Sequence, residues 1–196
     1  MSANAVGSGE GVCIWLTGRS GAGKTTLVRS LTPLLDASNR TYTLLDTVPA
    51  LAKQRWERTS ENKLMRKAYV AAEVVRHGGI AICVTVSASR QVRAAARTLV
   101  GDGHFLEVYV DTPPEVAWAR KSSRGRKPPL EKRLRARLRR VSRNATPGSF
   151  YEVPTAPDVT VDATTSTPDE AAQHVFDALV ARRFIAPTQN PAALPL

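Results

Sequence analysis

The stretch Gly18–Thr26, which reads GRSGAGKTT, constrains the fold of this chain more than any other. Its spacing fits the pattern G-x-x-x-x-G-K-[ST], which forms a phosphate-binding P-loop where a strand passes into a helix. Both neighbours have the required character, because the apolar run VCIWLT precedes it and the helix-forming run TTLVRSLTPLL follows it. A glycine-rich turn without this function would not need a strand before it and a helix after it. The motif therefore predicts an α/β fold that binds a nucleoside triphosphate at the start of its first helix.

The residue types in this loop suit a polyphosphate and a magnesium ion. Glycines let the backbone curl so that several N–H groups face one anion, and the helix N-terminus adds its positive dipole end. Lys24 can reach the β- and γ-phosphates, and the hydroxyl of Thr25 can hold Mg²⁺. We expect ATP and Mg²⁺ as cofactors, bound by a run of loop residues: Gly18, Ser20, Gly21, Ala22, Gly23, Lys24, Thr25 and Thr26.

The rest of the chain alternates apolar, strand-like runs with amphipathic, helix-like runs. Such alternation predicts a mostly parallel five-stranded sheet with helices on both faces, the three-layer sandwich of P-loop NTPases. The predicted strands are Val12–Thr17, Thr41–Leu45, Ile80–Val86, Phe105–Val110 and Val159–Val161. The predicted helices are Lys24–Leu35, Glu61–His77, Ser89–Leu99, Pro114–Lys121, Pro129–Val141 and Thr167–Phe184.

The length of 196 residues favours a single domain. We expect one P-loop domain over 11–185, with a lid at about 120–150 and flexible ends at 1–10 and 186–196. The first residues lack the basic and apolar parts of a secretory signal, and no apolar run is long enough for a membrane helix. These features predict a cytoplasmic protein with no membrane partner.

The formal net charge of +11 favours an anionic partner. Only 6% of the residues are aromatic, which leaves little surface for stacking the bases of a nucleic acid. We therefore expect a small anionic molecule rather than nucleic acid. Cys13 and Cys83 lie inside apolar runs with no other Cys or His at ligand spacing, which predicts two buried thiols rather than a disulfide or a metal site.

Four blocks beyond the loop resemble the adenylylsulfate kinase family, whose members phosphorylate the 3′-hydroxyl of adenosine 5′-phosphosulfate. The blocks keep the family's order over roughly residues 10 to 182, and they are VTVSASRQVRAAAR (Val84–Arg97), FLEVYVDTPPEVAWAR (Phe105–Arg120), FYEVP (Phe150–Pro154) and VTVDATTSTPDEAA (Val159–Ala172). The resemblance implies a P-loop kinase that transfers the γ-phosphate of ATP to an alcohol group. It also implies a homodimer.

The segment after the predicted second strand departs from the family. The family has aspartate-glycine-aspartate there, whereas this chain has Asp46, Thr47 and Val48. In the family the second aspartate lies near Mg²⁺ and the attacking hydroxyl. Asp46 is therefore our candidate to orient or deprotonate the acceptor hydroxyl and, with Thr25, to hold Mg²⁺. The alternative is an aspartate that only forms the turn after a strand.

Five further residues are candidates for binding the acceptor. Ser87 ends the predicted central strand, where it could bond a ligand or cap the next helix. Arg66 and Arg90 stand where the family has arginines, and Tyr151 lies in the FYEVP block. Arg55 follows Asp46 in the segment that the family uses around its acceptor. Arginines on such helices are otherwise solvated surface residues.

The stretch Arg120–Arg143 holds twelve Lys or Arg and a single acid, Glu131. In a small kinase this position is the lid over the phosphates, where arginines neutralise the charge of the transferred group. We expect Arg120 and Arg124 to contact the nucleotide. The same basic stretch could instead lie along RNA or DNA.

The ATP half of the family pattern is kept, while the acceptor half is changed. Lys63, Met65 and Arg66 replace an asparagine and two arginines of the family, so that only Arg66 keeps its type. We expect an ATP-dependent small-molecule kinase whose acceptor is an anionic hydroxyl compound other than adenylylsulfate, with nucleotide derivatives as candidates. Two alternatives stay open: a catalytically impaired ATP-binding regulatory or partner protein, and a nucleic-acid-directed P-loop enzyme.

Overall fold

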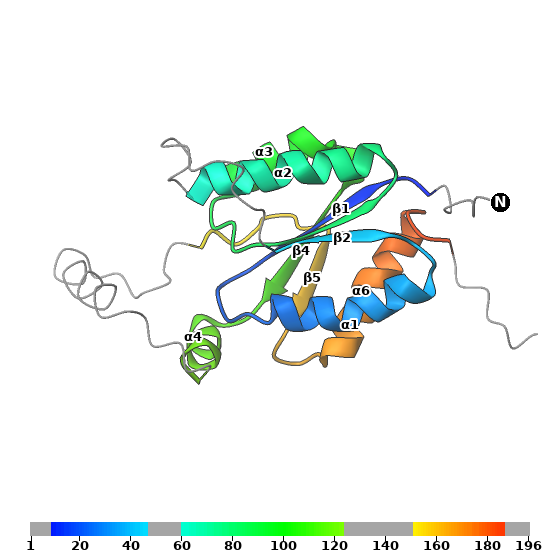
Figure 1. The fold of residues 1–196 in the computed structure, drawn as a ribbon. Helices are drawn as coiled ribbons and strands as arrows, with labels where there is room; N and C mark the ends of the chain where they lie inside the picture. Colours follow the sequence, from blue (N-terminus) through cyan, green and yellow to red (C-terminus); the bar gives the residue numbers. More distant parts are fainter. Residues whose placement is uncertain (1–8, 47–59, 124–150, 187–196) are drawn as a thin grey trace, which may run out of the picture.

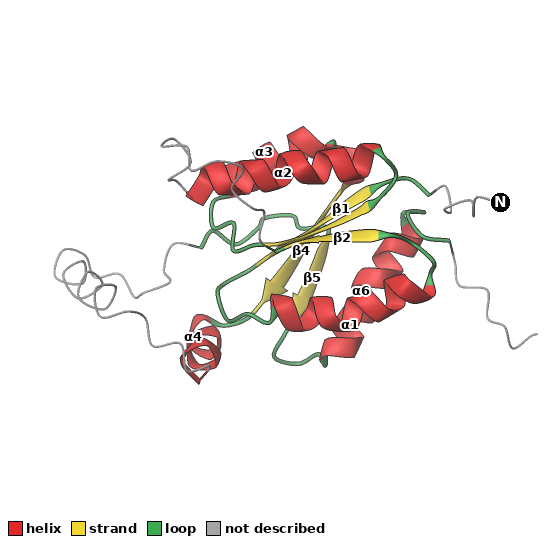
Figure 2. Cartoon of the chain, in the orientation of Figure 1, coloured by secondary structure: helices red, strands yellow, loops and turns green. Residues whose placement is uncertain are grey.

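Five parallel strands form the centre of the protein in the computed structural model, which describes residues 9–46, 60–123 and 151–186 (Figure 2). The strands are β1 (Val12–Thr17), β2 (Tyr42–Leu45), β3 (Ile80–Val84), β4 (Phe105–Asp111) and β5 (Val159–Asp162). Their spatial order is β2-β3-β1-β4-β5, and each neighbouring pair is parallel. The predicted α/β fold class is confirmed.

Helices cover both faces of this sheet (Figure 1). One face carries α2 (Ser60–Arg76) and α3 (Arg90–Val100), and the other carries α1 (Lys24–Ala37) and α6 (Pro168–Ala181). A short 3-10 helix, η2 (Asp102–His104), precedes β4, and α4 (Pro114–Ser123) follows it. The predicted helix at Pro129–Val141 lies outside the described residues.

The central strand β1 is buried on both sides, which explains its unbroken apolar sequence. Val12, Ile14 and Leu16 pack into a core with side chains of α1 and α6, and Cys13 and Trp15 pack into a second core with side chains of α2 and α3. Alternate residues of one strand therefore fix two separate helix layers. This packing holds the end of β1, and with it the P-loop, in a defined position.

The carboxyl ends of the parallel strands meet at one edge of the sheet. From β1 the chain first crosses to β2 on one side and later, through β3, to β4 on the other side. In open α/β sheets, ligands bind at such a switch in strand order, beyond the carboxyl ends. The topology therefore indicates a ligand site at the edge where the P-loop, Asp46 and Ser87 lie.

Cys13 and Cys83 are free, buried thiols, as the apolar runs around them predict. Their Sγ atoms are 3.9 Å apart. None of the helices in the described part of the chain is long and apolar enough to cross a membrane. The domain limits at residues 11 and 185 stay a prediction.

Candidate active site

The P-loop runs directly from β1 into the first turn of α1. Gly23 is the N-cap residue of α1 and has φ 110°, a left-handed conformation that suits glycine. Within the described residues, no side chain makes a capping hydrogen bond at this helix start. The N–H groups of Lys24 and Thr25, with the positive end of the helix dipole, can therefore face an anion, whereas the N–H of Thr26 donates to the carbonyl oxygen of Gly23 at 2.9 Å.

Gly21 lets the P-loop approach α4 closely. It has φ 97°, and a Cβ atom at this position would lie 2.1 Å from the carbonyl oxygen of Ala117 in α4. We expect Gly21→Ala to lower the free energy of unfolding by about 2 kcal/mol or more, because the backbone is strained and α4 must move. Gly103→Ala is the matched control, since no heavy atom lies within 4 Å of its Cβ position. Denaturant unfolding of both variants checks this, and equal stabilities would contradict it.

The side chain of Lys24 is folded back onto its own loop. Its Nζ donates hydrogen bonds to the carbonyl oxygens of Gly18 at 2.8 Å and Arg19 at 2.9 Å. Burial lowers the pKa of Lys24 to about 8 from its ordinary value of 10.5. An ammonium group held over the loop in this way can transfer its hydrogen bonds to a phosphate that enters the cradle.

The lowered pKa of Lys24 makes nucleotide binding dependent on pH. Below pH 8 the ammonium group is already present, whereas above pH 8 the polyphosphate must draw a proton onto Lys24. We expect ATP binding to take up about half a proton at pH 8 and to weaken by up to about tenfold per pH unit above that. Calorimetry in buffers of different ionisation enthalpy measures the uptake. The same uptake in Lys24→Met would assign it to another group.

A cavity of about 300 Å³ opens beside the P-loop. Gly23 and Thr26 line one side of it, and Thr164, Thr167 and Arg120 line the others. The guanidinium of Arg120, at the end of α4, donates a hydrogen bond of 3.0 Å to the carbonyl oxygen of Ala163. The predicted nucleotide contact Arg120 is thus next to the P-loop, while Arg124 lies outside the described residues.

Ser87 is buried at the carboxyl edge, where it lies in a network of hydroxyl groups. It has φ 32°, and its Oγ accepts hydrogen bonds from Trp15 Nε1 and Thr85 Oγ1 and donates one of 2.9 Å to Thr17 Oγ1. Thr17 in turn donates its hydrogen to the carbonyl oxygen of Val86, so the hydroxyl of Tyr151 is the donor in its 2.9 Å bond to Thr17. This network joins the ends of β1 and β3 to Tyr151.

The ring of Tyr151 lies against two guanidinium groups. Arg19 of the P-loop and Arg93 of α3 each place Cζ 5.5 Å from the ring centroid. Arg93 donates to the carbonyl oxygens of Ser87 and Glu152, and Arg90 Nε donates to the carbonyl oxygen of Val153 at 2.7 Å. The arginines of the family-like block therefore hold the segment around Tyr151 against the carboxyl edge.

Asp46 follows β2 directly and is exposed at the same edge. Its carbonyl oxygen accepts a hydrogen bond of 2.8 Å from Nζ of Lys67, a buried residue of α2. Arg66, next to Lys67 on α2, is half-buried. The predicted acceptor residue Arg55 and the position Val48 lie outside the described residues.

Lys67 is not among the residues singled out from the sequence, although the sequence holds a signal for its burial. Lys67 is three residues after Leu64 and four before Ala71, so helical spacing places it on the inward face of α2. A lysine on an apolar face is unusual, since charged side chains are rarely buried without partners. Arg19 was missed because the P-loop pattern leaves its position free.

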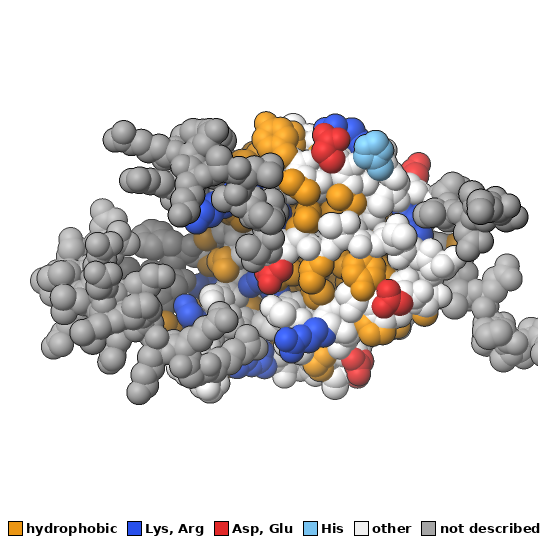
Figure 3. Space-filling view, viewed as in Figure 1, with side chains coloured by type: hydrophobic (Ala, Val, Ile, Leu, Met, Phe, Trp, Pro, Cys, Tyr) orange, Lys and Arg blue, Asp and Glu red, His pale blue; other side chains and the backbone are white. Residues whose placement is uncertain are grey.

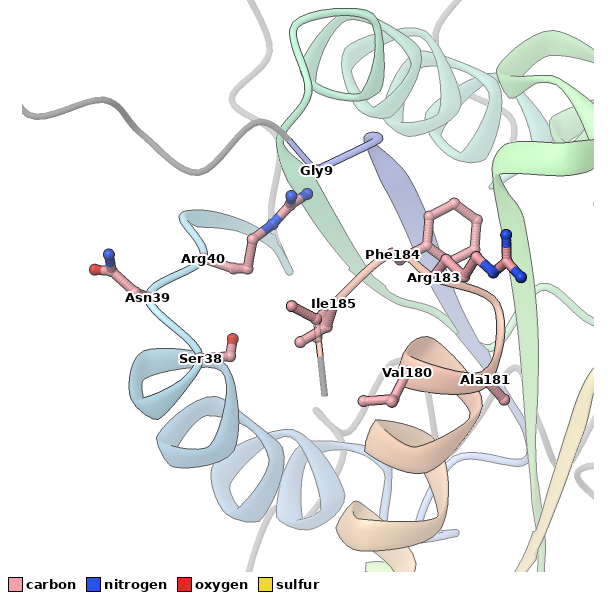
Figure 4. A pocket seen from close by; sticks show the side chains of 10 residues that line it. Gly9, Ser38, Asn39, Arg40, Val180, Ala181, Arg183, Phe184 and Ile185 are labelled. Atoms are coloured by element: carbon pink, nitrogen blue, oxygen red, sulfur yellow. The ribbon is translucent and has the colours of Figure 1, made fainter. Parts of the chain in front are cut away.

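A larger cavity, of about 670 Å³, lies at the opposite edge of the sheet (Figure 4). It opens between the last turns of α1 and α6, and Ser38, Arg40, Val180 and Ile185 line it. Arg40 donates hydrogen bonds to the carbonyl oxygens of Glu10 and Gly78, so it joins the chain segments that precede β1 and β3. This cavity is remote from the P-loop, and none of the predicted site residues lines it.

The parallel sheet, the P-loop at its switch point and the lysine over the cradle define a P-loop nucleotide-binding protein. A family model described as adenylylsulphate kinase matches residues 10–162. A probable adenylyl-sulfate kinase of Pyrococcus abyssi is 35% identical over 174 residues, which are 85% of this chain and 94% of that protein. An adenylyl-sulfate kinase of Pseudomonas aeruginosa is 34% identical over 85% of this chain and 84% of its own length.

Comparison of structures gives the same family. The APS kinase of Mycobacterium tuberculosis, solved in complex with AMPPNP and APS, is similar with a TM-score of 0.67 and 26% identity over 87% of this chain and 98% of that chain. The chain belongs to the adenylylsulfate kinase family, as its sequence blocks predict. It is accordingly an ATP-dependent kinase of this type.

Proposed function

We propose that this protein transfers the γ-phosphoryl group of Mg²⁺-bound ATP to a hydroxyl group of an anionic small molecule. The observation that carries the proposal is the placement of a phosphate cradle, a buried lysine and an exposed carboxylate on one edge of a parallel sheet. Lys24 balances the charge of the γ-phosphate, and Asp46 orients or deprotonates the attacking hydroxyl. The phosphoryl group then passes in line from the leaving oxygen of ADP to the acceptor.

ATP would occupy the P-loop and the cavity beside it. The triphosphate contacts the N–H groups between Gly18 and Thr26, and the nucleoside enters the cavity of about 300 Å³ next to Arg120. In the proposed complex the guanidinium of Arg120 lies within reach of the nucleotide. Arg124 stays a predicted contact of the nucleotide.

The residues at this edge suit magnesium. Thr25 is exposed in the first turn of α1 and Asp46 is exposed after β2, so one hydroxyl and one carboxylate are available at the edge. Oxygen ligands of this kind, together with phosphate oxygens and water, are those that Mg²⁺ prefers. When bound, the ion would neutralise negative charge on the β- and γ-phosphates.

The acceptor would lie beyond the ends of β2 and β3. Asp46, Arg66 and Arg90 can offer charged groups there, since Asp46 directly follows β2 and the two arginines lie on α2 and α3, the helices that begin at this edge. The hydroxyls of Ser87 and Tyr151 are hydrogen-bonded inside the protein, so we propose that these two residues shape the floor of the acceptor site. Arg55 stays a predicted contact.

We propose that the preferred acceptor differs from adenylylsulfate, on the basis of sequence. Val48 removes a carboxylate that the family places near the reacting hydroxyl, and Met65 removes a guanidinium from the acceptor half. A lost guanidinium removes a bidentate contact to an anionic group. An acceptor with a different arrangement of negative charge therefore fits the changed residues better.

A panel of hydroxyl compounds tests this proposal. Adenylylsulfate, nucleotides, sugar phosphates and small hydroxy acids are each incubated with ATP and Mg²⁺, and ADP formation is followed. We expect one anionic member to stimulate ATP consumption and to gain a phosphate by mass spectrometry. Adenylylsulfate as the best substrate would overturn the proposed change in specificity. Nucleotide binding without transfer to any acceptor would favour an ATP-binding regulatory protein.

The nucleic-acid alternative and the oligomeric state need separate measurements. The described residues show acidic and basic side chains mixed on the face seen in Figure 3, rather than one continuous basic surface. A steep salt dependence of RNA or DNA binding would nevertheless support a nucleic-acid-directed enzyme.

For the homodimer implied by the resemblance, light scattering should give twice the chain mass of 21.2 kDa.

A further inference from the structure

A buried ammonium group lies at the carboxyl edge of the sheet, at the ends of β2 and β3 and outside the P-loop. It belongs to Lys67 of α2, whose residue surface is only 7% exposed. Its Nζ donates hydrogen bonds to the carbonyl oxygens of Asp46 at 2.8 Å and Val84 at 3.0 Å. The mechanism proposed above gives this lysine no role.

These two carbonyl groups mark the point where the pairing of β2 and β3 ends. Leu45 and Cys83 form the last pair of the β2–β3 ladder, so Asp46 and Val84 are the next residues in register. Beyond the last rung, backbone carbonyl groups need another donor. The ammonium group of Lys67 supplies it for both strands at once and thereby ties the end of β2 to β3 and α2.

A lysine is a costly residue for such a task. Burial lowers the pKa of Lys67, because removing the ammonium group from water disfavours its charge, while the nearby Cys83 and Asp46 act in the opposite direction. The side chain also occupies the inward face of an otherwise apolar part of α2, near Ala68 and Ala71. Charged groups whose pKa is shifted by burial next to specific partners cluster at functional sites.

The end of β2 needs such an anchor more than the end of the central strand β1 does. β2 is an edge strand of four residues that pairs only with β3, whereas β1 pairs on both sides. The sheet therefore supports the backbone at Asp46 from the β3 side. Because Val48 replaces the second acid of the family pattern, the placement of this single carboxylate matters all the more for the reaction.

We propose that Lys67 is a positioning residue for phosphoryl transfer, which fixes the backbone of Asp46 so that its carboxylate meets the acceptor hydroxyl. This inference rests on the proposed function, because it assumes that Asp46 acts on that hydroxyl. Small displacements of a reacting group lower rates strongly, by about 10²-fold for a shift of about 1 Å. The loss of the anchor should therefore appear in the catalytic rate rather than in ATP binding.

A double-mutant cycle tests the proposal on the full chain. Lys67→Met, Asp46→Asn and the double variant are compared with the unmodified protein for ATP turnover, with water as acceptor and with the best acceptor of the panel. We expect Lys67→Met to lower kcat by about 10- to 100-fold, with the KM for ATP changed less than about twofold. In the Asp46→Asn background the same substitution should cost almost nothing further, because it acts through Asp46.

Controls separate this effect from a loss of structure. Arg76→Met removes an exposed cation from the end of the same helix and should leave kcat unchanged. If Lys67→Met does not bind ATP, the cycle is run with Lys67→Gln, whose amide keeps one donor and should show a smaller loss with the same dependence on Asp46. An equal loss of kcat in both backgrounds would show a merely structural role and would overturn the proposal.

The cycle also distinguishes a failure of the positioning role of Lys67 from a failure of the proposed role of Asp46. A large loss in Asp46→Asn combined with normal turnover in Lys67→Met would overturn the role of Lys67 alone. Normal turnover in Asp46→Asn would instead remove the proposed role of Asp46 and, with it, the positioning role of Lys67.

Discussion

Replacing Lys24 by methionine is expected to lower the turnover of ATP by about 10²- to 10³-fold. Lys24 is the buried cation nearest to the phosphate cradle, and it already donates two hydrogen bonds to the loop that forms it. Charge that spreads over the transferred phosphoryl group has to be balanced at this point, and one preorganised donor contributes about 10²- to 10³-fold. ATP binding should also weaken, by about tenfold, since part of this interaction exists before the transfer. Steady-state kinetics and calorimetry measure the two effects.

Arg29→Met is the matched control for this variant. Arg29 lies on the same helix, α1, but is exposed, so its replacement removes one positive charge without touching the cradle. Turnover should stay within about twofold of the unmodified protein. Equal losses in both variants would point to a general electrostatic effect of net charge, and would remove the specific role of Lys24.

Replacing Asp46 by asparagine is expected to lower turnover by about 10²- to 10⁴-fold while ATP binding changes little. Asparagine keeps the size of the side chain but cannot accept a proton or bind a cation as a carboxylate does. ATP binding should be retained because Asp46 follows β2, two strands away from the P-loop. Rapid-quench kinetics with ATP and the best acceptor measure the transfer step itself.

A second aspartate at a strand end provides the control for Asp46. Asp111 is exposed at the end of β4, and its carboxylate accepts a hydrogen bond of 2.8 Å from the hydroxyl of Tyr109. We expect Asp111→Asn to change turnover by less than about threefold, because this carboxylate has a structural partner. If Asp46→Asn behaved in the same way, Asp46 would be a turn residue and the proposed mechanism would lose its acid–base group.

Local patterns were sufficient to predict most of the fold. The P-loop between an apolar run and a helical run determined β1 and α1, and continuous apolar runs indicated strands that are covered on both faces. The prediction for β3 extended to Val86, whereas the strand ends at Val84. The reason is that Ser87 turns the chain with φ 32° and points its hydroxyl inward to Trp15 and Thr17. Apolar character alone does not reveal such a change of direction.

Contacts between distant segments were harder to predict than elements. The hydrogen bond from Lys67 to Asp46 joins residues 21 positions apart, and the bond from Tyr151 to Thr17 joins residues 134 positions apart. Their existence depends on the order of the strands, which short sequence patterns do not specify. The residue types at the site were therefore visible in the sequence, while the way in which they support one another required the structure.

The two separate cores have a consequence for how such an enzyme changes its chemistry over time. Side chains of α1 and α6 pack on one face of the sheet and side chains of α2 and α3 on the other, with β1 contributing alternate residues to each. Substitutions on distant, independent layers affect stability nearly additively. Mutations in the first turns of α2, which begins near the proposed acceptor side, can therefore accumulate without repacking the layer that carries the phosphate cradle. The scaffold in effect permits a lineage to exchange its phosphate acceptor while it keeps its phosphate donor.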